Sequence, residues 1–334
     1  LLDRVPPSAA VNAGVSQITR IRGKGMAGFA NAVLRKLSRG ALSREQAVWG
    51  NVPTWLQGAL EQTVGAEEAR ALVGASGEAA TTGLRLKQGE TLGDSADFIP
   101  SAVVPGALRW QGAGDPRRLE VYRTGKLAVQ EEGAQLLALA LGARRGERIW
   151  DACAGRGQKT TLLAERVNAG ELWASDLYPN KLDALQRELT RMGLPEVQTR
   201  ALDLTCGVGD LPADFDRVLV DAPCTGTGTL RRRPEILLRL QASDATRLGM
   251  LAEQIVRTAA TRLRPGGRLV FSVCSVLQQE CEAVVERLSD MLAPVPFDAP
   301  EVTRLFGAEV TAFRLLTGQH GTDGYFAASL SRRS

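Results

Sequence analysis

The chain has 334 residues, of which 44% are hydrophobic and 23% charged, and its formal net charge is +4. This is the composition of a globular protein with a real core, and the length predicts two or three domains. No apolar run reaches the roughly 20 residues that span a bilayer, and the scattered cysteines form neither a disulfide framework nor a CxxC zinc pattern. We therefore expect a cytoplasmic protein with reduced thiols, no membrane association and no metal.

Residues 1–43 are predicted to form a pair of helices joined by a basic turn. Apolar residues recur at helical spacing from Ser8 to Leu37, and the run Arg22-Gly23-Lys24-Gly25 interrupts them. A small packing module and an RNA contact explain this pattern equally well. Because the chain begins at Leu1, without methionine and within a helical pattern, we expect further residues upstream.

Residues 44–138 are predicted to hold short helices and then a small α+β segment. One helix begins at Pro53 and runs to Val64, and another covers Ala66 to Val73. From Thr81 to Arg123, short β-like pieces alternate with glycine and proline. The boundary with the last domain is expected between Gly125 and Leu139.

Residues 139–334 alternate between strand and helix patterns, which is typical of βαβ units in a parallel sheet. The predicted strands are 148–152, 171–175, 197–201, 216–220 and 268–273, and the predicted helices are 160–167, 181–192 and 243–262. Two further segments, 310–316 and 325–330, are expected to close the sheet as a hairpin. The last domain is therefore predicted to have an α/β fold.

A glycine-containing loop follows the first of these strands and opens a helix. It reads Asp151-Ala152-Cys153-Ala154-Gly155-Arg156-Gly157-Gln158-Lys159-Thr160. Glycine lets a backbone approach a ligand, and a helix N-terminus offers free amide donors. A tight strand-to-helix turn also needs glycine for structural reasons, so this loop alone leaves ligand binding open.

Acidic residues at the following strand ends favour a ligand pocket. Asp176 lies about 20 residues beyond the glycines, where Rossmann-type sites hold a ribose diol, and Asp203 and Asp221 end the next two strands. The spacing of a phosphate-binding loop is absent. A nucleoside cofactor without phosphate, such as S-adenosylmethionine, therefore fits better than a dinucleotide.

Two cysteines are expected at the same sheet edge. Cys224 lies in Asp221-Ala222-Pro223-Cys224-Thr225-Gly226-Thr227-Gly228, and Cys274 lies in Phe271-Ser272-Val273-Cys274-Ser275-Val276. A free cysteine is more often a small buried hydrophobe, and we assign that role to the thiols of Cys153, Cys206 and Cys281. Two thiols at one edge instead favour covalent catalysis with separate attack and release steps.

These residues resemble the RNA cytosine-5 methyltransferases of the NOL1/NOP2/Sun group. The Cys224 segment with the following Leu230-Arg231-Arg232-Arg233-Pro234-Glu235 is similar to that family's fourth motif, and Val273-Cys274-Ser275-Val276-Leu277 is similar to its sixth. Arg191-Met192-Gly193-Leu194 and Asp323-Gly324-Tyr325-Phe326 also fit its pattern. Phe29-Ala30-Asn31-Ala32-Val33-Leu34-Arg35-Lys36 resembles the end of the NusB-like helical domain that precedes the catalytic part in bacterial 16S ribosomal RNA enzymes.

The resemblance implies three parts and one reaction. Residues 1–43 are expected to be the C-terminal part of a NusB-like RNA-binding domain, 44–138 a helical linker with an α+β RNA-binding segment, and 139–334 a Rossmann-like class I methyltransferase domain. The implied reaction methylates C5 of a cytosine in 16S ribosomal RNA. A transfer RNA cytosine-5 methyltransferase and a catalytically weak, RNA-binding ribosome-assembly factor are the alternatives.

The resemblance also implies roles for individual residues. Cys274 resembles the nucleophile that attacks C6, Cys224 the cysteine required for release, and protonated Asp221 is expected to donate to cytosine N3. Arg231, Arg232 and Arg233 are expected to meet RNA phosphates, around a cytosine that must be unstacked. The protein is expected to act as a monomer.

The implied S-adenosylmethionine site centres on the glycine loop and the row of acids. Its residues are Cys153, Ala154, Gly155, Arg156, Gly157, Gln158, Lys159, Asp176, Asp203 and Asp221. The family loop reads Ala-x-Pro-Gly-Gly-Lys-Thr, so this chain departs from it at Arg156 and Gln158. Because Gly155 and Gly157 remain, we expect the loop to close with Gln158 facing away.

Overall fold

A computed structural model describes residues 5–39, 44–92, 96–167 and 170–333. The chain divides into two compact units, Leu1–Val52 and Pro53–Ser334. The domain boundaries expected after residues 43 and 138 stay predictions. In the described ranges, no helix combines the length and the apolar character needed to cross a membrane.

The first unit is helical, as its periodicity predicts. Helix α1 (Pro7–Arg39) is broken at Gly23, where φ is 80° and ψ is 175°, so it consists of two helices in one run. Glycine permits this break because other residues rarely adopt a positive φ. The predicted helix pair is therefore confirmed, and α2 (Arg44–Gly50) follows it.

The second unit begins with two helices and a small antiparallel sheet. Helices α3 (Thr54–Val64) and α4 (Ala66–Gly74) agree with the predicted pair. The sheet has the order β2-β3-β1-β4. Its strands are β1 (Thr82–Leu86), β2 (Phe98–Pro100), β3 (Ala107–Trp110) and β4 (Leu127–Val129), with α5 (Glu120–Arg123) before β4. This confirms the predicted α+β segment.

The large sheet has the order β10-β12-β9-β8-β5-β6-β7, with β11 beside β12. Strands β5 to β9 pair in parallel, and β10, β11 and β12 join antiparallel. The strands are β5 (Arg148–Asp151), β6 (Glu171–Asp176), β7 (Gln198–Ala201), β8 (Phe215–Asp221), β9 (Leu263–Val273), β10 (Leu292–Pro294), β11 (Ala312–Leu315) and β12 (Tyr325–Arg332). The predicted Rossmann-like sheet and its closing hairpin are thus confirmed.

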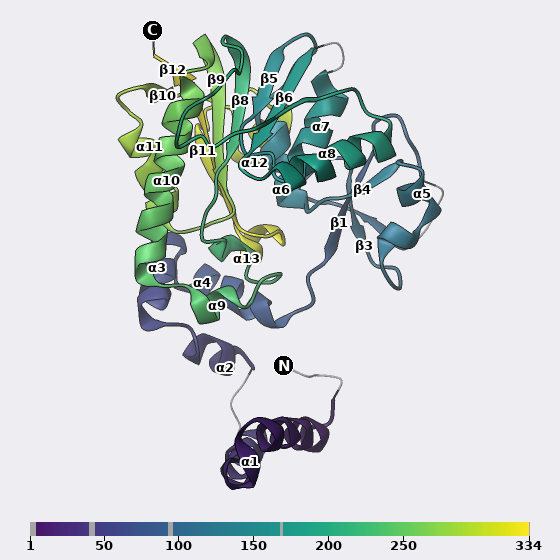
Figure 1. Cartoon of the computed structure of the whole chain (residues 1–334), viewed down its shortest axis with the longest axis vertical. Coiled ribbons are helices and arrows are strands. Elements are labelled where there is room, and N and C mark those ends of the chain that lie inside the picture. The colour runs from purple at the N-terminus through teal and green to yellow at the C-terminus, as the bar shows by residue number, and fades with distance from the viewer. Residues whose placement is uncertain (1–4, 40–43, 93–95, 168–169, 334) are drawn as a thin grey trace. The chain divides into compact units, whose positions relative to one another are not determined.

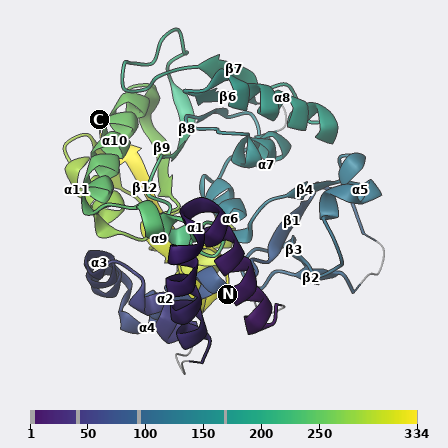
Figure 2. The same cartoon turned by 60° about the horizontal axis from the view of Figure 1, so that its bottom comes forward.

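Helices cover both faces of this sheet (Figures 1 and 2). Helices α6 (Glu132–Ala140), α7 (Gln158–Val167), α8 (Pro179–Met192) and α12 (Pro300–Phe306) supply one core, and α10 (Ala242–Ala260) and α11 (Glu282–Arg287) supply the other. Short helices α9 (Ile236–Arg239) and α13 (Thr317–His320) lie in loops. Successive residues of a strand point to opposite faces of the sheet. When helices bury both faces, the central strands of a sheet are therefore mainly apolar.

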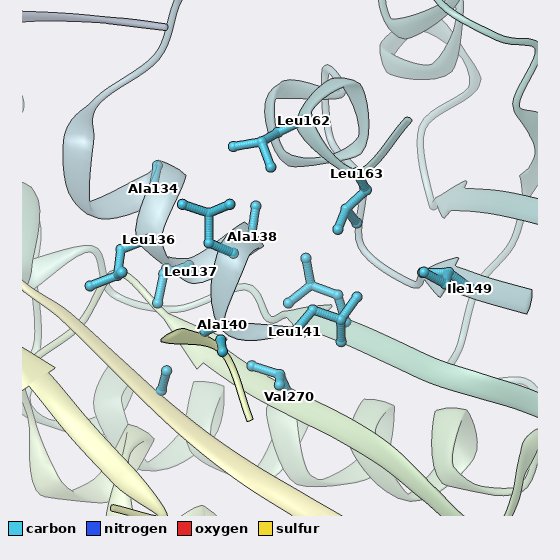
Figure 3. Packing of buried hydrophobic residues seen from close by; sticks show 14 of the residues in the cluster. Ala134, Leu136, Leu137, Ala138, Ala140, Leu141, Ile149, Leu162, Leu163 and Val270 are labelled. Atoms are coloured by element: carbon cyan, nitrogen blue, oxygen red, sulfur yellow. The ribbon is translucent and has the colours of Figure 1, made fainter. Parts of the chain in front are cut away.

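Strand β5 shows how the two cores divide. Ile149 belongs to the core under α6 and α7, and its neighbour Trp150 belongs to the core under α10. Figure 3 shows Leu141 of the α6 segment between Leu137 and Ile149, in the same buried core as Leu163 of α7. These buried layers hold the strand ends rigidly, and the candidate site lies on those ends.

Candidate active site

A cavity of about 310 Å³ opens at the carboxyl ends of β5, β6 and β8. Strand β5 lies between β6 and β8, so the strand order reverses there. Open α/β sheets bind ligands at such a reversal. The cavity is lined by Ala152, Cys153, Gly155, Asp176, Leu177, Tyr178, Lys181, Leu202, Asp203, Leu204, Thr205, Asp221, Pro223, Leu251 and Ile255. Within the described ranges, no cluster of His, Cys, Asp and Glu is arranged to hold a metal ion.

The glycine loop after β5 is closed by Asp176. The Gly155 N–H donates to Asp176 Oδ2 over 3.0 Å, and the Tyr178 N–H donates to Oδ1 over 2.9 Å. Gly157 has a φ of 84°, and a Cβ there would lie 2.2 Å from Leu185 Cδ1. Glycine is therefore required at position 157 by both backbone conformation and space.

The structure brings only part of the predicted cofactor set to the cavity. Those that line it are Cys153, Gly155, Asp176, Asp203 and Asp221. Ala154 and Gly157 are buried within the loop. Asp203 is exposed, and hydrogen bonds from the hydroxyl and backbone of Thr205 lower the pKa of its carboxyl.

Arg156 and Gln158 point elsewhere. They line a separate cavity of about 240 Å³ with Arg117 and Tyr122, next to the small sheet. Gln158 Nε2 donates to the Val129 carbonyl over 3.3 Å, so this side chain faces away from the cofactor cavity, as expected. Neither side chain lines the cofactor cavity, so the structure does not support the direct cofactor contact predicted for them.

Lys159 links the glycine loop to the predicted catalytic acid. Its Nζ donates to Asp221 Oδ2 over 2.6 Å, and Ser272 Oγ donates to Oδ1 over 3.0 Å. Burial alone lowers the pKa of Lys159, but the attraction and hydrogen bond of Asp221, together with the charges of Asp151 and Cys274, outweigh burial, so that the pKa is raised. Lys159 and Asp221 therefore form an ion pair beside the cavity, and the donor role expected for Asp221 stays a prediction.

The two predicted cysteines lie together. Strands β8 and β9 are parallel neighbours with Asp221 opposite Ser272, so the loops that follow them start side by side. Cys224 Sγ is 3.3 Å from Cys274 Sγ. The hydrogen bond with Cys274, and after it burial, raises the pKa of the Cys224 thiol. Either sulfur can donate in this contact, which places the two thiols within hydrogen-bond distance of each other.

The predicted arginine run is divided between two environments. Arg232 Nε and Arg231 Nη2 pair with the buried carboxylate of Asp323 at 2.5 and 3.3 Å. Arg233 is exposed, and its guanidinium pairs with the exposed Glu235 at 3.3 Å. Of the run, Arg233 therefore has the most exposed side chain, and contact of the run with RNA phosphates stays a prediction.

Sequence reasoning missed several residues of the site. Leu177 and Tyr178 follow Asp176 directly, line the cavity and remain 51% and 54% exposed. Large apolar side chains next to a strand-end acid were the signal that could have identified them. Glu280 was also missed, although it bonds to the residues that follow both cysteines.

Asp151 ends β5 directly before the glycine loop, and its side chain is turned inward. It is 1% exposed, and Thr160 Oγ1 donates to its Oδ2 over 2.7 Å. Its Oδ1 has no hydrogen-bond partner among the described residues. Burial raises the pKa of this carboxyl from 3.8 to about 7.

We expect Asp151→Asn to stabilise the protein more at pH 8 than at pH 5. The folded state keeps the Asp151 proton up to about pH 7, whereas the unfolded chain loses it near pH 4. The contribution of Asp151 to stability is therefore fully present below pH 4 and falls as the pH rises through 7. Asparagine cannot ionise, so its advantage in free energy of unfolding should grow by about 2–3 kcal/mol between the two pH values.

Denaturant unfolding at both pH values measures this, and the exposed Asp183→Asn is the control. An equal effect of Asp151→Asn at both values would contradict the expectation.

Comparisons with known proteins agree with this site. Residues 138–331 match the family model described as 16S rRNA methyltransferase RsmB/F, and residues 1–39 match the NusB family. Ribosomal RNA small subunit methyltransferase B of Pasteurella multocida is 31% identical over 360 residues, which cover 99% of this chain and 77% of that protein. The protein of the same name from Xylella fastidiosa (strain Temecula1) is 32% identical, over 98% of this chain and 77% of that protein.

A solved structure agrees with the fold. The methyltransferase homolog protein from Pyrococcus horikoshii superimposes with a TM-score of 0.67 at 26% identity, over 83% of this chain and 94% of that chain. The expected resemblance to bacterial 16S ribosomal RNA methyltransferases that carry a NusB-like domain is confirmed. Because the matched residues 138–331 include the large sheet and both cysteine loops, this chain belongs to the RsmB/F family of 16S rRNA methyltransferases.

Proposed function

We propose that this chain transfers a methyl group from S-adenosylmethionine to C5 of a cytosine in 16S ribosomal RNA, with Cys274 bonding covalently to C6. The observation that carries the proposal is the cysteine pair, 3.3 Å apart, on loops that adjoin the cavity at Asp221 and Pro223. Relatives at 31% and 32% identity are named as ribosomal RNA small subunit methyltransferases, which supports the RNA substrate.

The residues of the cavity fit a nucleoside cofactor without phosphate. Asp176 lies where a carboxylate accepts from ribose hydroxyls, and two carboxylate oxygens have lone pairs beyond the backbone bonds they already accept. Leu177 and Ile255 offer apolar surface for a purine ring. The basic residue of the lining, Lys181, is already paired with Asp176 at 3.1 Å, which suits a cofactor without phosphate. When bound, the cofactor supplies an electrophilic methyl group.

Cys274 starts the reaction because cytosine C5 is too weak a nucleophile by itself. Its thiolate adds to C6, the C5–C6 double bond opens, and electron density moves to C5, which takes the methyl group. A base then removes the C5 proton, the double bond re-forms, and the bond between Cys274 Sγ and C6 breaks. We assign this release to Cys224, whose sulfur lies beside that of Cys274.

Asp221 is proposed to donate a hydrogen bond to cytosine N3 as negative charge develops there. In the ligand-free protein, Lys159 holds the proton next to that carboxylate, 2.6 Å from Oδ2. The donor role therefore requires Asp221 to gain a proton when the base enters, and Lys159 is the side chain that contacts its Oδ2.

The RNA side of the site is proposed from exposure and charge. Arg233 contacts phosphates next to an unstacked cytosine, while Arg231 and Arg232 hold Asp323. One chain carries every group named here, so a monomer in the cytoplasm, where ribosomal RNA is modified, is the proposed working form.

Labelled S-adenosylmethionine with protein-free 16S ribosomal RNA tests the proposal. We expect methyl incorporation at cytosine C5, mapped by bisulfite treatment, and a loss of at least about 10³-fold in Cys274→Ala because no second nucleophile replaces the thiol. Cys206→Ala, which removes an exposed thiol, is the matched control and should keep its activity. Incorporation into transfer RNA instead, or tight RNA binding without incorporation, would overturn the proposal in favour of the two alternatives.

A further inference from the structure

We propose that Glu280 is a positioning residue: its carboxylate ties the Cys224 loop to the Cys274 loop and so fixes the distance between the two thiols. The inference rests on the proposed function only in that both cysteines act on one base. Glu280 is the last residue of a short turn, Gln278–Glu280, and is 1% exposed.

The first set of contacts holds the Cys224 loop. The Thr225 N–H donates to Glu280 Oε1 over 2.6 Å, and Thr225 Oγ1 donates to Oε2 over 2.6 Å. Thr225 follows Cys224 directly, so these two bonds restrain the backbone from which the thiol projects.

The second set holds the Cys274 loop. Ser275 Oγ donates to Glu280 Oε2 over 2.5 Å, and Ser275 follows Cys274 directly. The Gly228 N–H also donates to the Cys274 carbonyl over 3.0 Å. One carboxylate therefore bonds to the residue after each cysteine, although the two loops are separated by 50 positions in the sequence.

A carboxylate is chemically suited to this position. It accepts hydrogen bonds through both oxygens and donates none when charged, and here it receives three donors from two loops. No ion pair reaches Glu280 among the described residues, and burial raises the pKa of its carboxyl. The hydrogen bonds from both cysteine loops are thus what compensate its burial.

The charge of Glu280 also acts on the thiol of Cys224. Glu280 and Asp221 add to the hydrogen bond and the burial that raise the pKa of Cys224, whereas Lys159 has its electrostatic contact with Cys274. Glu280 therefore favours the protonated form of the Cys224 thiol.

How readily the two thiols meet can be tested without RNA or cofactor, through the rate at which diamide oxidises them to a disulfide. Each thiol gives up one proton and one electron, the sulfurs join, and diamide is reduced to its hydrazine. A disulfide needs sulfurs about 2.05 Å apart, so a pair at 3.3 Å closes with little backbone movement. Peptide mapping identifies the Cys224–Cys274 bond, and Cys224→Ser shows the background.

We expect Glu280→Ala to form this disulfide at least about tenfold more slowly, because loss of hydrogen bonds to a charged group frees both loops. Glu280→Gln keeps an acceptor for the Thr225 N–H and an amide for the two hydroxyls, so its rate should stay within about threefold of the unmodified protein. If Glu280→Ala does not fold, Thr225→Val and Ser275→Ala each remove one contact and are expected to slow the reaction partially.

Asp298→Asn is the matched control. It weakens an ion pair with Arg217, near the opposite end of β8, and so reduces stability without touching either cysteine loop. Its oxidation rate should equal that of the unmodified protein. A folded Glu280→Ala that oxidises at the unmodified rate would overturn the inference. Slow oxidation in Glu280→Ala together with no methyl transfer by the unmodified protein would leave the positioning role standing and reject the proposed function.

Discussion

Replacing Cys224 by alanine is expected to stop the reaction after methyl transfer, so that the protein accumulates as a covalent complex with its RNA. Cys274 keeps its position because its loop is held by Ser275 and Gly228. The group assigned to release, 3.3 Å away, is lost. Removing a group that assists proton transfer and release costs about 10²–10⁴-fold in rate, so turnover should fall by at least about 10²-fold.

Denaturing gel electrophoresis measures the complex directly, because a thioether bond to C6 survives detergent and heat. With S-adenosylmethionine and 16S ribosomal RNA, Cys224→Ala should convert most of the protein to a slow-moving band that nuclease removes. The double variant Cys224→Ala, Cys274→Ala should give no band, which separates a bond through Cys274 from non-specific attachment. A Cys224→Ala protein that turns over normally would reject the release role.

The cysteine pair shows what sequence pattern predicts well. Both thiols follow long apolar runs, which predict buried parallel strands, and the carboxyl ends of parallel strands share one edge. The observed pairing of Asp221 with Ser272 places the two loops side by side. The helix break at Gly23 was equally predictable, since glycine in a helical pattern signals a permitted change of direction.

Contacts between distant loops were not predictable from local pattern. Arg231 and Arg232 form part of a basic run, yet they pair with Asp323, more than 90 positions later. The contacts of Glu280 were unpredictable for the same reason, because its hydrogen-bond donors lie on loops that follow two different strands. Periodicity reports which face of an element is buried, and it carries no information about which charged side chains meet across loops.

Short elements were also missed. Helices α11 and α12 have 6 and 7 residues, and strand β10 has 3. Two turns of helix or one pleat of strand contain too few residues for a period to be recognised. These elements form because the sheet already presents an apolar surface, on which Val284 and Val302 are fully buried.

Replacing Asp176 by alanine is expected to reduce affinity for S-adenosylmethionine by at least about 100-fold, because hydrogen bonds to a charged group contribute about 1.5–3 kcal/mol each. This carboxylate holds the Gly155 and Tyr178 amides and pairs with Lys181. Its loss therefore removes the proposed ribose acceptor and releases the loop that closes over the cavity. Isothermal titration calorimetry with S-adenosylmethionine, in the absence of RNA, measures the affinity.

Two further variants separate these causes. Asp183→Ala makes the same change of charge on an exposed position of α8 and should bind as the unmodified protein does. Asp176→Asn keeps an acceptor for one of the two amides, so it should bind more tightly than the alanine variant but below the unmodified protein. Unchanged affinity in Asp176→Ala would show that the cavity is not the cofactor site. If instead the unmodified protein binds no cofactor, the departures at Arg156 and Gln158 become the relevant difference, because both side chains line a separate cavity and not the one that Cys153 and Gly155 line.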